Sequence, residues 1–307
     1  MTRLSIAEAV PLGAASVLRL ASDHGVRALL VKGEALRLQG LRGAYESTDV
    51  DVLVDPADFD RYLTVLAALG WVGPPTSTAP SIMERHAVTV LHPAWPISVD
   101  VHRYFPGFLA DKQEVFDILW QRRESVQIAG VPLPVPDRVA HAAVAALHLL
   151  RSPDSGKAAE QLPELQRLVD DSFDTEALAD LADVAQRTGA TQTLRPLLTS
   201  VGAPLLGVGA GDPQRLAQWR ARTGATGSEA WVLHLLRQPP WRWPREIRHA
   251  VVLSDAEIEA FHQHPGESLP QARRRRLRRG VRSVAVAVPN VLRLRSRALL
   301  DRLRGRR

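Results

Sequence analysis

Two aspartates separated by one residue, Asp49 and Asp51, are the side chains of this sequence best suited to chemistry. Valines alternate with other residues over 48–54, which is typical of a β-strand, so both aspartates share a face with Cα atoms about 6.6 Å apart. Two ionised carboxylates about 5 Å apart repel each other by about 3 kcal/mol at an effective dielectric constant of about 20. A divalent cation removes this repulsion and binds carboxylate oxygens well. A solvated edge strand with two surface aspartates is the alternative.

A third carboxylate, Asp100, lies in a second alternating run, residues 97–102. On a neighbouring strand it would complete a metal site and could take a proton from an attacking hydroxyl group. A surface acid on the strand is the alternative. His102 shares the face of Asp100 and could be a metal ligand, a partner of a ligand, or a histidine on the strand face, of which the last is the commonest.

The pair Lys32 and Gly33 follows a short apolar run, residues 26–31, and precedes a predicted helix. Backbone N–H groups and a lysine at such a position can contact phosphate oxygens. A Lys-Gly turn alone is common in proteins, so it indicates a phosphate site only together with the carboxylates.

The predicted elements that position these side chains form a small mixed sheet with helices packed on it, an α/β (α+β) fold. Strands are predicted over 26–31, 48–54, 87–91 and 97–102, the last two as a hairpin with a proline-containing loop, and helices over 5–24, 34–41 and 55–70. After a proline-rich step at 131–136 the sequence is rich in alanine and leucine, and helices are predicted over 138–150, 160–170, 175–188 and 191–200. His141 and His148 share a helix face, where core or interface histidines are favoured.

These patterns predict three parts of the chain: a catalytic domain over 1–136, a helical domain over 137–264, and a linker with a basic amphipathic arm over 265–307. Residues 271–307 contain 14 arginines and one acid, Asp301, so this segment carries a charge of +13. Because the net charge of the whole chain is +6, the rest of the chain carries −7. The arm suits an anionic partner such as a membrane surface, a nucleic acid or an acidic peptide. A flexible solubilising tail is the alternative.

The 307-residue chain contains no cysteine, which excludes disulfides, thiolate metal sites and cysteine nucleophiles. The first residues lack the uninterrupted apolar stretch of a secretory signal, and no run of about 18 apolar residues is present. We therefore expect a cytoplasmic protein.

The motifs together resemble the nucleotidyltransferase superfamily that includes DNA polymerase beta. The resemblance is carried by the runs at 29–36, 48–54 and 99–102, with Tyr45 between the first two. The sequence is most similar to a bacterial nucleotidyltransferase family found in peptide-tailoring gene clusters, lasso-peptide clusters included, and in surface-polysaccharide clusters.

The resemblance implies that Asp49 and Asp51 bind two catalytic Mg²⁺ or Mn²⁺ ions and that Asp100 binds one ion and activates the acceptor. It implies that Lys32 and Gly33 contact the triphosphate of a nucleoside triphosphate (NTP). The superfamily has Gly-Ser or Gly-Gly at this turn, whereas Glu34 follows Gly33 here. A carboxylate beside phosphates is unfavourable unless it points away.

The resulting hypothesis is an enzyme that transfers a nucleoside monophosphate from an NTP to a hydroxyl or phosphate acceptor, such as a modified peptide or a sugar. A non-catalytic nucleotide-binding regulatory module is one alternative. A toxin-like nucleotidyltransferase that acts on RNA or protein is the other.

Overall fold

The computed structural model describes residues 4–73, 86–153, 155–207, 211–223, 238–251 and 268–278, with single residues and short pieces between 232 and 289. The chain forms two compact units, one of residues 1–73 and 86–219 and the other of residues 74–85 and 220–307. The domain boundaries that the sequence suggests at 136 and 264 stay predictions. All of the site residues singled out above lie in the first unit.

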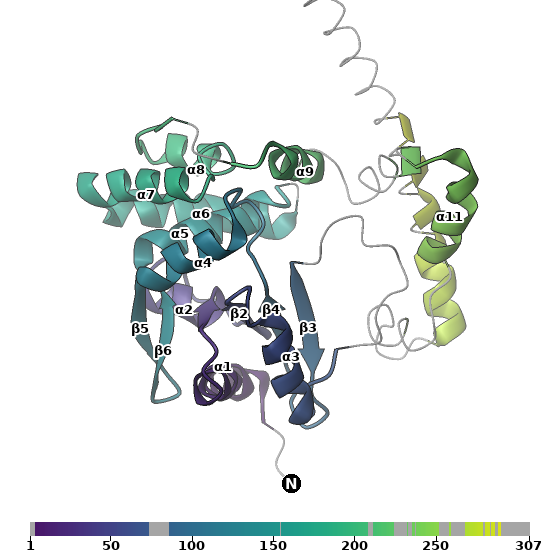
Figure 1. Cartoon of the computed structure of the whole chain (residues 1–307), viewed down its shortest axis with the longest axis horizontal. Coiled ribbons are helices and arrows are strands. Elements are labelled where there is room, and N and C mark those ends of the chain that lie inside the picture. The colour runs from purple at the N-terminus through teal and green to yellow at the C-terminus, as the bar shows by residue number, and fades with distance from the viewer. Residues whose placement is uncertain are drawn as a thin grey trace, which may run out of the picture. The chain divides into compact units, whose positions relative to one another are not determined.

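A four-stranded mixed sheet lies at the centre of the first unit (Figure 1). Its order is β1 (Ala28–Val31), β2 (Asp49–Val54), β4 (Ser98–His102) and β3 (Ala87–Leu91). The strands β3 and β4 are antiparallel, as the predicted hairpin requires, and β1 is antiparallel to β2. The pairing of β2 with β4 is parallel and sets Asp51 directly opposite Asp100.

The two faces of β2 pack into two different cores, which follows from the alternation of its side chains. Val50, Val52 and Val54 belong to a cluster with α1 (Ile6–Asp23) and α3 (Phe59–Ala68). Leu53, on the face of the aspartates, belongs to a second cluster that the later helices form. The sheet face that carries the carboxylates therefore continues directly into the helical core.

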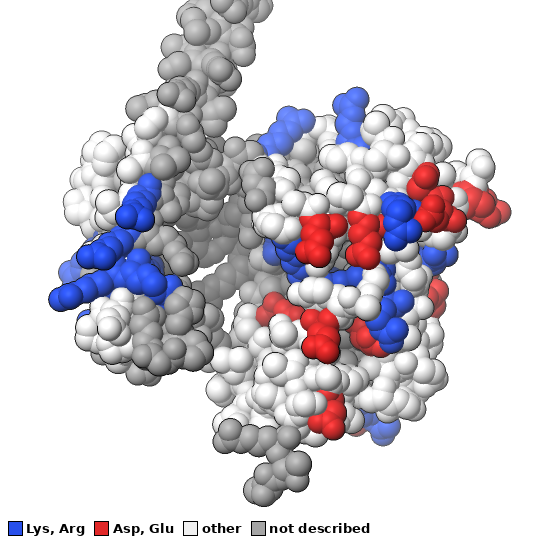
Figure 2. All heavy atoms as spheres, turned by 180° about the vertical axis from the view of Figure 1, so that it is seen from behind, with Lys and Arg blue, Asp and Glu red and all other residues white. Residues whose placement is uncertain are grey.

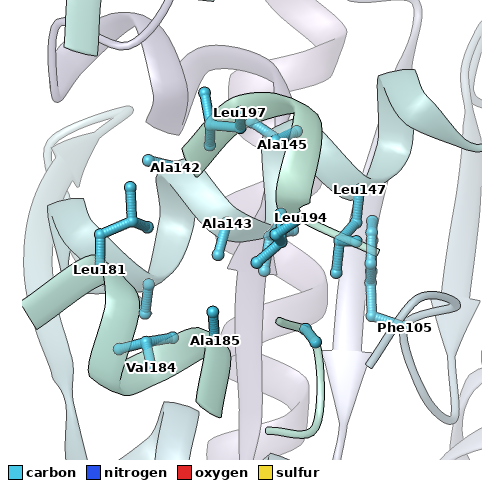
Figure 3. Packing of buried hydrophobic residues seen from close by; sticks show 14 of the residues in the cluster. Phe105, Ala142, Ala143, Ala145, Leu147, Leu181, Val184, Ala185, Leu194 and Leu197 are labelled. Carbon is cyan, nitrogen blue, oxygen red and sulfur yellow. The ribbon is translucent and has the colours of Figure 1, made fainter. Parts of the chain in front are cut away.

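The helical region comprises α5 (Arg138–Leu150), α6 (Gly156–Ser172), α7 (Thr175–Arg187) and α8 (Arg195–Ser200), so the four predicted helices are present. Figure 3 shows the alanines of α5 packed against leucine and valine side chains of α7 and α8. Alanine at these positions lets neighbouring helices approach closely. The helix α6 begins earlier than predicted because the Ser155 hydroxyl accepts a hydrogen bond from the N–H of Ala158, 3.1 Å.

The sequence analysis did not predict α4 (Lys112–Gln121), β5 (Arg123–Ile128) or β6 (Val131–Pro136). The strands β5 and β6 pair as an antiparallel hairpin, so the proline-rich step is a strand. Its prolines occupy alternate positions, so their missing N–H groups all lie on one side of the strand and the other side can still pair. Ala129 and Gly130 form the turn with φ of 51° and 75°.

The remaining described elements are α2 (Gly33–Leu38), which follows β1, then α9 (Pro213–Thr223), a 3-10 turn (Pro240–Arg242) and α11 (Trp243–Val251). Residues 269–278, at the start of the predicted basic arm, are helical, and residues 290–307 lie outside the described residues. Acidic and basic side chains are interspersed on the larger unit in Figure 2. Within the described part of the chain, no helix is long and apolar enough to span a membrane.

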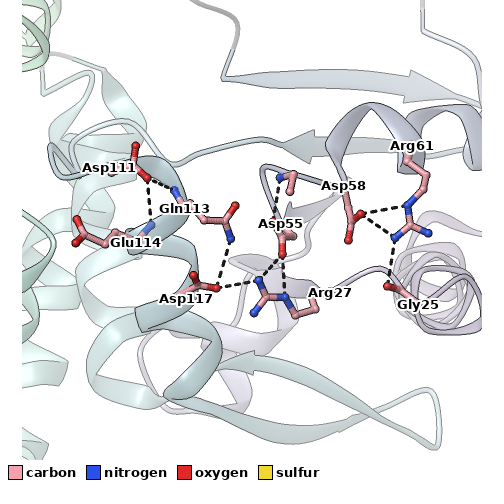
Figure 4. Close-up of polar contacts among 10 residues, drawn as sticks. Gly25, Arg27, Asp55, Asp58, Arg61, Asp111, Gln113, Glu114 and Asp117 are labelled. Carbon is pink, nitrogen blue, oxygen red and sulfur yellow. Dashed lines mark hydrogen bonds and ion pairs between the residues drawn. The ribbon is translucent and has the colours of Figure 1, made fainter.

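Arg27, directly before β1, connects α4 to the sheet by ion pairs (Figure 4). The Nε of Arg27 donates to Asp55 Oδ2 at 2.8 Å, and its Nη2 lies 2.8 Å from Asp117 Oδ1 on α4. The guanidinium carbon also lies 5.2 Å from the ring centre of Phe116. Because the Asp55 side chain is only 6% exposed, loss of Arg27 would leave a buried carboxylate without its ion pair.

The change Arg27→Ala is therefore expected to lower the free energy of unfolding by about 2 kcal/mol, a value reduced by the solvent exposure of the arginine. Urea denaturation followed by circular dichroism measures this. Arg19→Ala is the matched control, because Arg19 pairs with Asp23 on the exposed face of α1, and it is expected to cost less than about 0.5 kcal/mol. Equal effects of the two changes would contradict the role assigned to Arg27.

Candidate active site

The five residues singled out by the sequence line one pocket of about 370 Å³ between the sheet, α2, α5 and α6. Asp49, Asp51 and Asp100 come from the parallel strands, and Lys32 and Gly33 come from the turn between β1 and α2. The pocket is also lined by polar residues that the sequence analysis did not assign to the site: Arg42, Tyr45, Ser47, Thr48, His86, Thr89, His102, His148, Arg151, Lys157, Gln161 and Glu164.

The Asp51 carboxylate is the most deeply placed of the three, with 5% of its side chain exposed. Burial by itself raises the pKa of this group, but a hydrogen bond from His102 and the charge of Lys32 outweigh burial and hold the pKa well below its usual range. The Nε2 atom of His102 lies 2.8 Å from Asp51 Oδ1, and the Lys32 ammonium forms an ion pair with the same oxygen. His102 is thus a direct partner of Asp51, beyond the plain strand-face position that the sequence favoured.

Asp49 and Asp100 have weaker compensation. Burial raises the pKa of Asp49, and the negative charges of Asp51 and Asp100 raise it further, against the opposing effect of Lys32. The Ser47 hydroxyl lies 3.1 Å from Asp49 Oδ1, and the Thr89 hydroxyl donates to Asp100 Oδ1 at 2.6 Å. The two hydroxyl groups therefore hold these carboxylates in place.

A divalent cation fits this set of donors. Asp51, Asp100 and His102 each offer one ligand atom, and these atoms lie within 4.8 Å of one another. Carboxylate oxygens suit Mg²⁺ or Mn²⁺, and an imidazole nitrogen is also a ligand for transition metals. Asp49 lines the same pocket, but among the described residues its carboxylate is not part of this closest group. His102 Nδ1 is buried and has no hydrogen-bond partner within the described structure.

The turn after β1 has a strained backbone. Lys32 has φ 66° and ψ −156°, a region that side-chain-bearing residues rarely adopt and that costs about 1–3 kcal/mol. Gly33 follows with φ 51°, and a Cβ atom there would lie 3.4 Å from Ser47 Oγ. The N–H of Lys32 donates to His141 Nε2 at 2.8 Å, so it points into the core and not toward a ligand. Any phosphate contact of Lys32 must therefore come from its ammonium group.

The carboxylate of Glu34 does not disturb the pocket. It forms an ion pair with Arg37 on the next turn of α2, and its Oε2 accepts from Arg37 Nε at 2.9 Å. Glu34 is not among the residues that line the pocket. Glu34 departs from the superfamily pattern, but its side chain pairs with Arg37 and does not line the pocket.

Among the cations that line the pocket and that sequence reasoning missed are Arg42 and Lys157. The guanidinium carbon of Arg42 lies 3.7 Å from the ring centre of Tyr45, and its Nη2 donates to Gln161 Oε1 at 3.3 Å. Burial lowers the pKa of Lys157, and the charges of Arg42 and Lys32 lower it further. A connecting segment and α6 supply these residues, so no local motif could have indicated them.

The two histidines of α5 have different surroundings. His141 is fully buried, as predicted for a core histidine. His148 lines the pocket, and its Nδ1 is buried with no hydrogen-bond partner among the described residues. Burial, and then the charge of Lys32, lower the pKa of His148 to about 2, so it is neutral at physiological pH. It can donate or accept a hydrogen bond but carries no charge.

The sequence profile of a family described as uncharacterised nucleotidyltransferases matches residues 12–203, which is more than half of the chain. The chain belongs to this family. The match covers the sheet with its carboxylates and also α5 to α8, so every residue that lines the pocket lies within it. No curated protein matches the sequence.

Several solved structures show a distant likeness to this nucleotidyltransferase. The antibiotic-resistance factor ANT(2'')-Ia is 13% identical with a TM-score of 0.39, and the match covers 62% of this chain and 94% of that one. An antigenic nucleotidyltransferase-like protein from Paracoccidioides brasiliensis is 12% identical with a TM-score of 0.36, over 64% and 93% of the two chains. The Bacillus stearothermophilus CCA-adding enzyme in complex with CTP is 17% identical with a TM-score of 0.25, over 81% and 68%.

The metal site can be tested with Mn²⁺ alone. Asp51→Asn and Asp100→Asn are each expected to weaken Mn²⁺ binding at least about tenfold, because each removes a charged oxygen ligand. Electron paramagnetic resonance of free Mn²⁺ measures the dissociation constant. Asp171→Asn is the control, because Asp171 pairs with Arg167 on an exposed helix face. Unchanged Mn²⁺ affinity in both site variants would exclude these carboxylates as ligands.

Proposed function

We propose that the protein is a metal-dependent nucleotidyltransferase that moves a nucleoside monophosphate from an NTP to a hydroxyl or phosphate acceptor, with release of pyrophosphate. The family membership supports the transfer from an NTP. One observation carries the metal-dependent part of the proposal. The parallel pairing of β2 with β4 sets Asp51 against Asp100 in a pocket that also contains the Lys32 ammonium.

The carboxylates of Asp49, Asp51 and Asp100 are the proposed metal-holding groups, with the imidazole of His102 beside them. Bound Mg²⁺ or Mn²⁺ would neutralise charge that develops on the phosphoryl oxygens during in-line displacement. His102 and Lys32 already contact Asp51 Oδ1 and keep this carboxylate ionised and oriented. The site is therefore prepared to hold a cation without rearrangement of the sheet.

Three of the cations that line the pocket are the proposed contacts of the triphosphate. Lys32, Arg42 and Lys157 line the pocket together, and after burial the charges of Arg42 and Lys32 lower the pKa of Lys157 further. A polyphosphate between these side chains would satisfy them by charge-assisted hydrogen bonds. Held there, the pyrophosphate leaving group would be oriented away from the acceptor and its departing charge stabilised.

Asp100 is the proposed proton acceptor for the attacking hydroxyl group. The Thr89 hydroxyl occupies Asp100 Oδ1, which fixes the rotation of the carboxylate and leaves Oδ2 as the oxygen available to the acceptor. A carboxylate so placed can orient the hydroxyl and take its proton as the new P–O bond forms. A phosphate acceptor would need no such proton transfer and only the orientation.

The acceptor is proposed from the resemblance alone: a modified peptide, a sugar or a small metabolite with a hydroxyl or phosphate group. A relation to the peptide-tailoring and polysaccharide families, the cytoplasmic location and an anionic partner for the basic arm all stay predictions. The non-catalytic and the toxin-like alternatives are outcomes of the experiments that follow.

Purified protein with each NTP, Mg²⁺ or Mn²⁺ and a panel of hydroxyl and phosphate acceptors is expected to release pyrophosphate, which a coupled phosphate assay measures. Asp51→Asn and Asp100→Asn are expected to reduce turnover at least about 10³-fold, because each weakens charge stabilisation at the reacting phosphorus. Asp171→Asn is expected to retain full turnover. NTP binding without any turnover, unaffected by Asp51→Asn, would favour the regulatory module. Turnover only with RNA would favour the toxin-like enzyme.

The phosphate contacts have their own signature in the kinetics. Lys157→Ala is expected to raise the KM for the NTP about tenfold with a smaller change in kcat, because it removes a ground-state contact with the polyphosphate. Lys157→Arg keeps the charge and is the conservative control. A change in kcat alone would place Lys157 outside the triphosphate site.

A further inference from the structure

A chain of buried hydrogen bonds connects the strained turn at Lys32 to residues distant in sequence. The N–H of Lys32 donates to His141 Nε2 at 2.8 Å, across 109 positions of sequence. His141 is 0% exposed, and its Nδ1 lies 2.5 Å from Gln39 Oε1. The Nε2 of Gln39 then donates to the carbonyl of Pro136 and to Glu124 Oε1, both at 2.8 Å.

The direction of every hydrogen bond in this chain follows from the first. A backbone N–H can only donate, so His141 Nε2 must accept, and Nδ1 must carry the proton. That proton is donated to the Gln39 carbonyl oxygen, which leaves the Gln39 amide nitrogen facing its two acceptors. Burial lowers the pKa of His141 to about 3, so the ring stays neutral, as the arrangement requires. The chain of bonds has one consistent orientation.

Lys32 links this chain to the reacting centre. The backbone N–H of Lys32 donates to His141, and the ammonium group of Lys32 forms an ion pair with Asp51, the buried carboxylate of the proposed metal site. The backbone of Lys32 sets the starting direction of its side chain, so relaxation of φ and ψ to an ordinary region would carry the ammonium away from Asp51. Misplacement of a reacting group by about 1 Å can reduce rates about 10²-fold.

We propose that His141, oriented by Gln39, is a positioning residue that holds Lys32 in its strained conformation and so aims the Lys32 ammonium at Asp51 and the phosphates of the NTP. The effect on NTP rests on the proposed function. The effect on the Lys32 backbone does not, and the two can be measured separately.

The test compares His141→Leu, which removes the acceptor, with His141→Gln, whose amide oxygen can reach the position of Nε2. Leu181→Ala is the control for stability, because Leu181 is fully buried in the helical core but belongs to α7 and not to the turn. Amide hydrogen exchange of residues 28–38 is the first readout. Exchange in this segment is expected to be at least about tenfold faster in His141→Leu and near the wild-type rate in His141→Gln. In Leu181→Ala it is expected to change only as much as the global free energy of unfolding changes.

Affinity for the NTP with Mg²⁺ is the second readout. His141→Leu is expected to raise the NTP dissociation constant and to lower kcat/KM, each about 10- to 100-fold. Both quantities are expected to recover substantially in His141→Gln and to have wild-type values in folded Leu181→Ala. Gln39→Leu removes the carbonyl oxygen that holds the proton on Nδ1 of His141. This change is expected to alter hydrogen exchange and NTP affinity less than His141→Leu does. It replaces His141→Leu if that variant does not fold.

Unchanged exchange of residues 28–38 in folded His141→Leu, or in Gln39→Leu in its place, would overturn the proposal. So would a loss of NTP affinity in Leu181→Ala that matches the loss in His141→Leu, since the effect would then follow stability alone. If the wild-type protein neither binds nor turns over any NTP, the proposed function fails, while the exchange measurement still decides the role of His141.

Discussion

The approach of Asp51 to Asp100 is the constraint on which the rest of the site depends. The register of two parallel strands sets it, so side-chain motion alone cannot separate the two residues widely. A buried carboxylate beside a second one is costly unless cations neutralise the pair. The chain supplies two partial solutions at Asp51, the His102 imidazole from β4 and the Lys32 ammonium from the turn after β1, and both strands flank β2 in the sheet.

The helical region is part of the site as much as the sheet. The aspartate-bearing face of β2 continues through Leu53 into the core of α5 to α8, which fixes α5 over the pocket. From there α5 directs His148 into the pocket and His141 against the Lys32 turn, while α6 adds Lys157. The alanine-rich composition of α5 permits this close packing, because small side chains let the helix approach its neighbours. Catalytic geometry and core packing are therefore set by the same helix.

The sequence revealed the residues of the sheet better than those around it. Alternation over 48–54 and 97–102 is a local pattern, so the shared face of Asp49 and Asp51 and the strand of Asp100 could be predicted. The parallel pairing of these strands depends on contacts distant in sequence, and no local pattern encodes it. Arg42 and Lys157 have no motif, and alternating prolines concealed β6 because proline usually argues against a strand. His102 could be placed on the right face, but its bond to Asp51 needed the register.

Burial is the largest cause of both shifted pKa values in the pocket. Neighbouring acids raise the pKa of Asp49 further, against the charge of Lys32, and neighbouring cations lower the pKa of Lys157 further, against the charges of Asp49 and Asp51. A free cation would relieve only the carboxylates, and a free polyphosphate only Arg42 and Lys157. A polyphosphate that carries its own metal ion would relieve the carboxylates and these cations at once, and the metal and the polyphosphate would then strengthen each other's binding. For the proposed metal-dependent transfer, such coupling would favour the metal–NTP complex over either component alone.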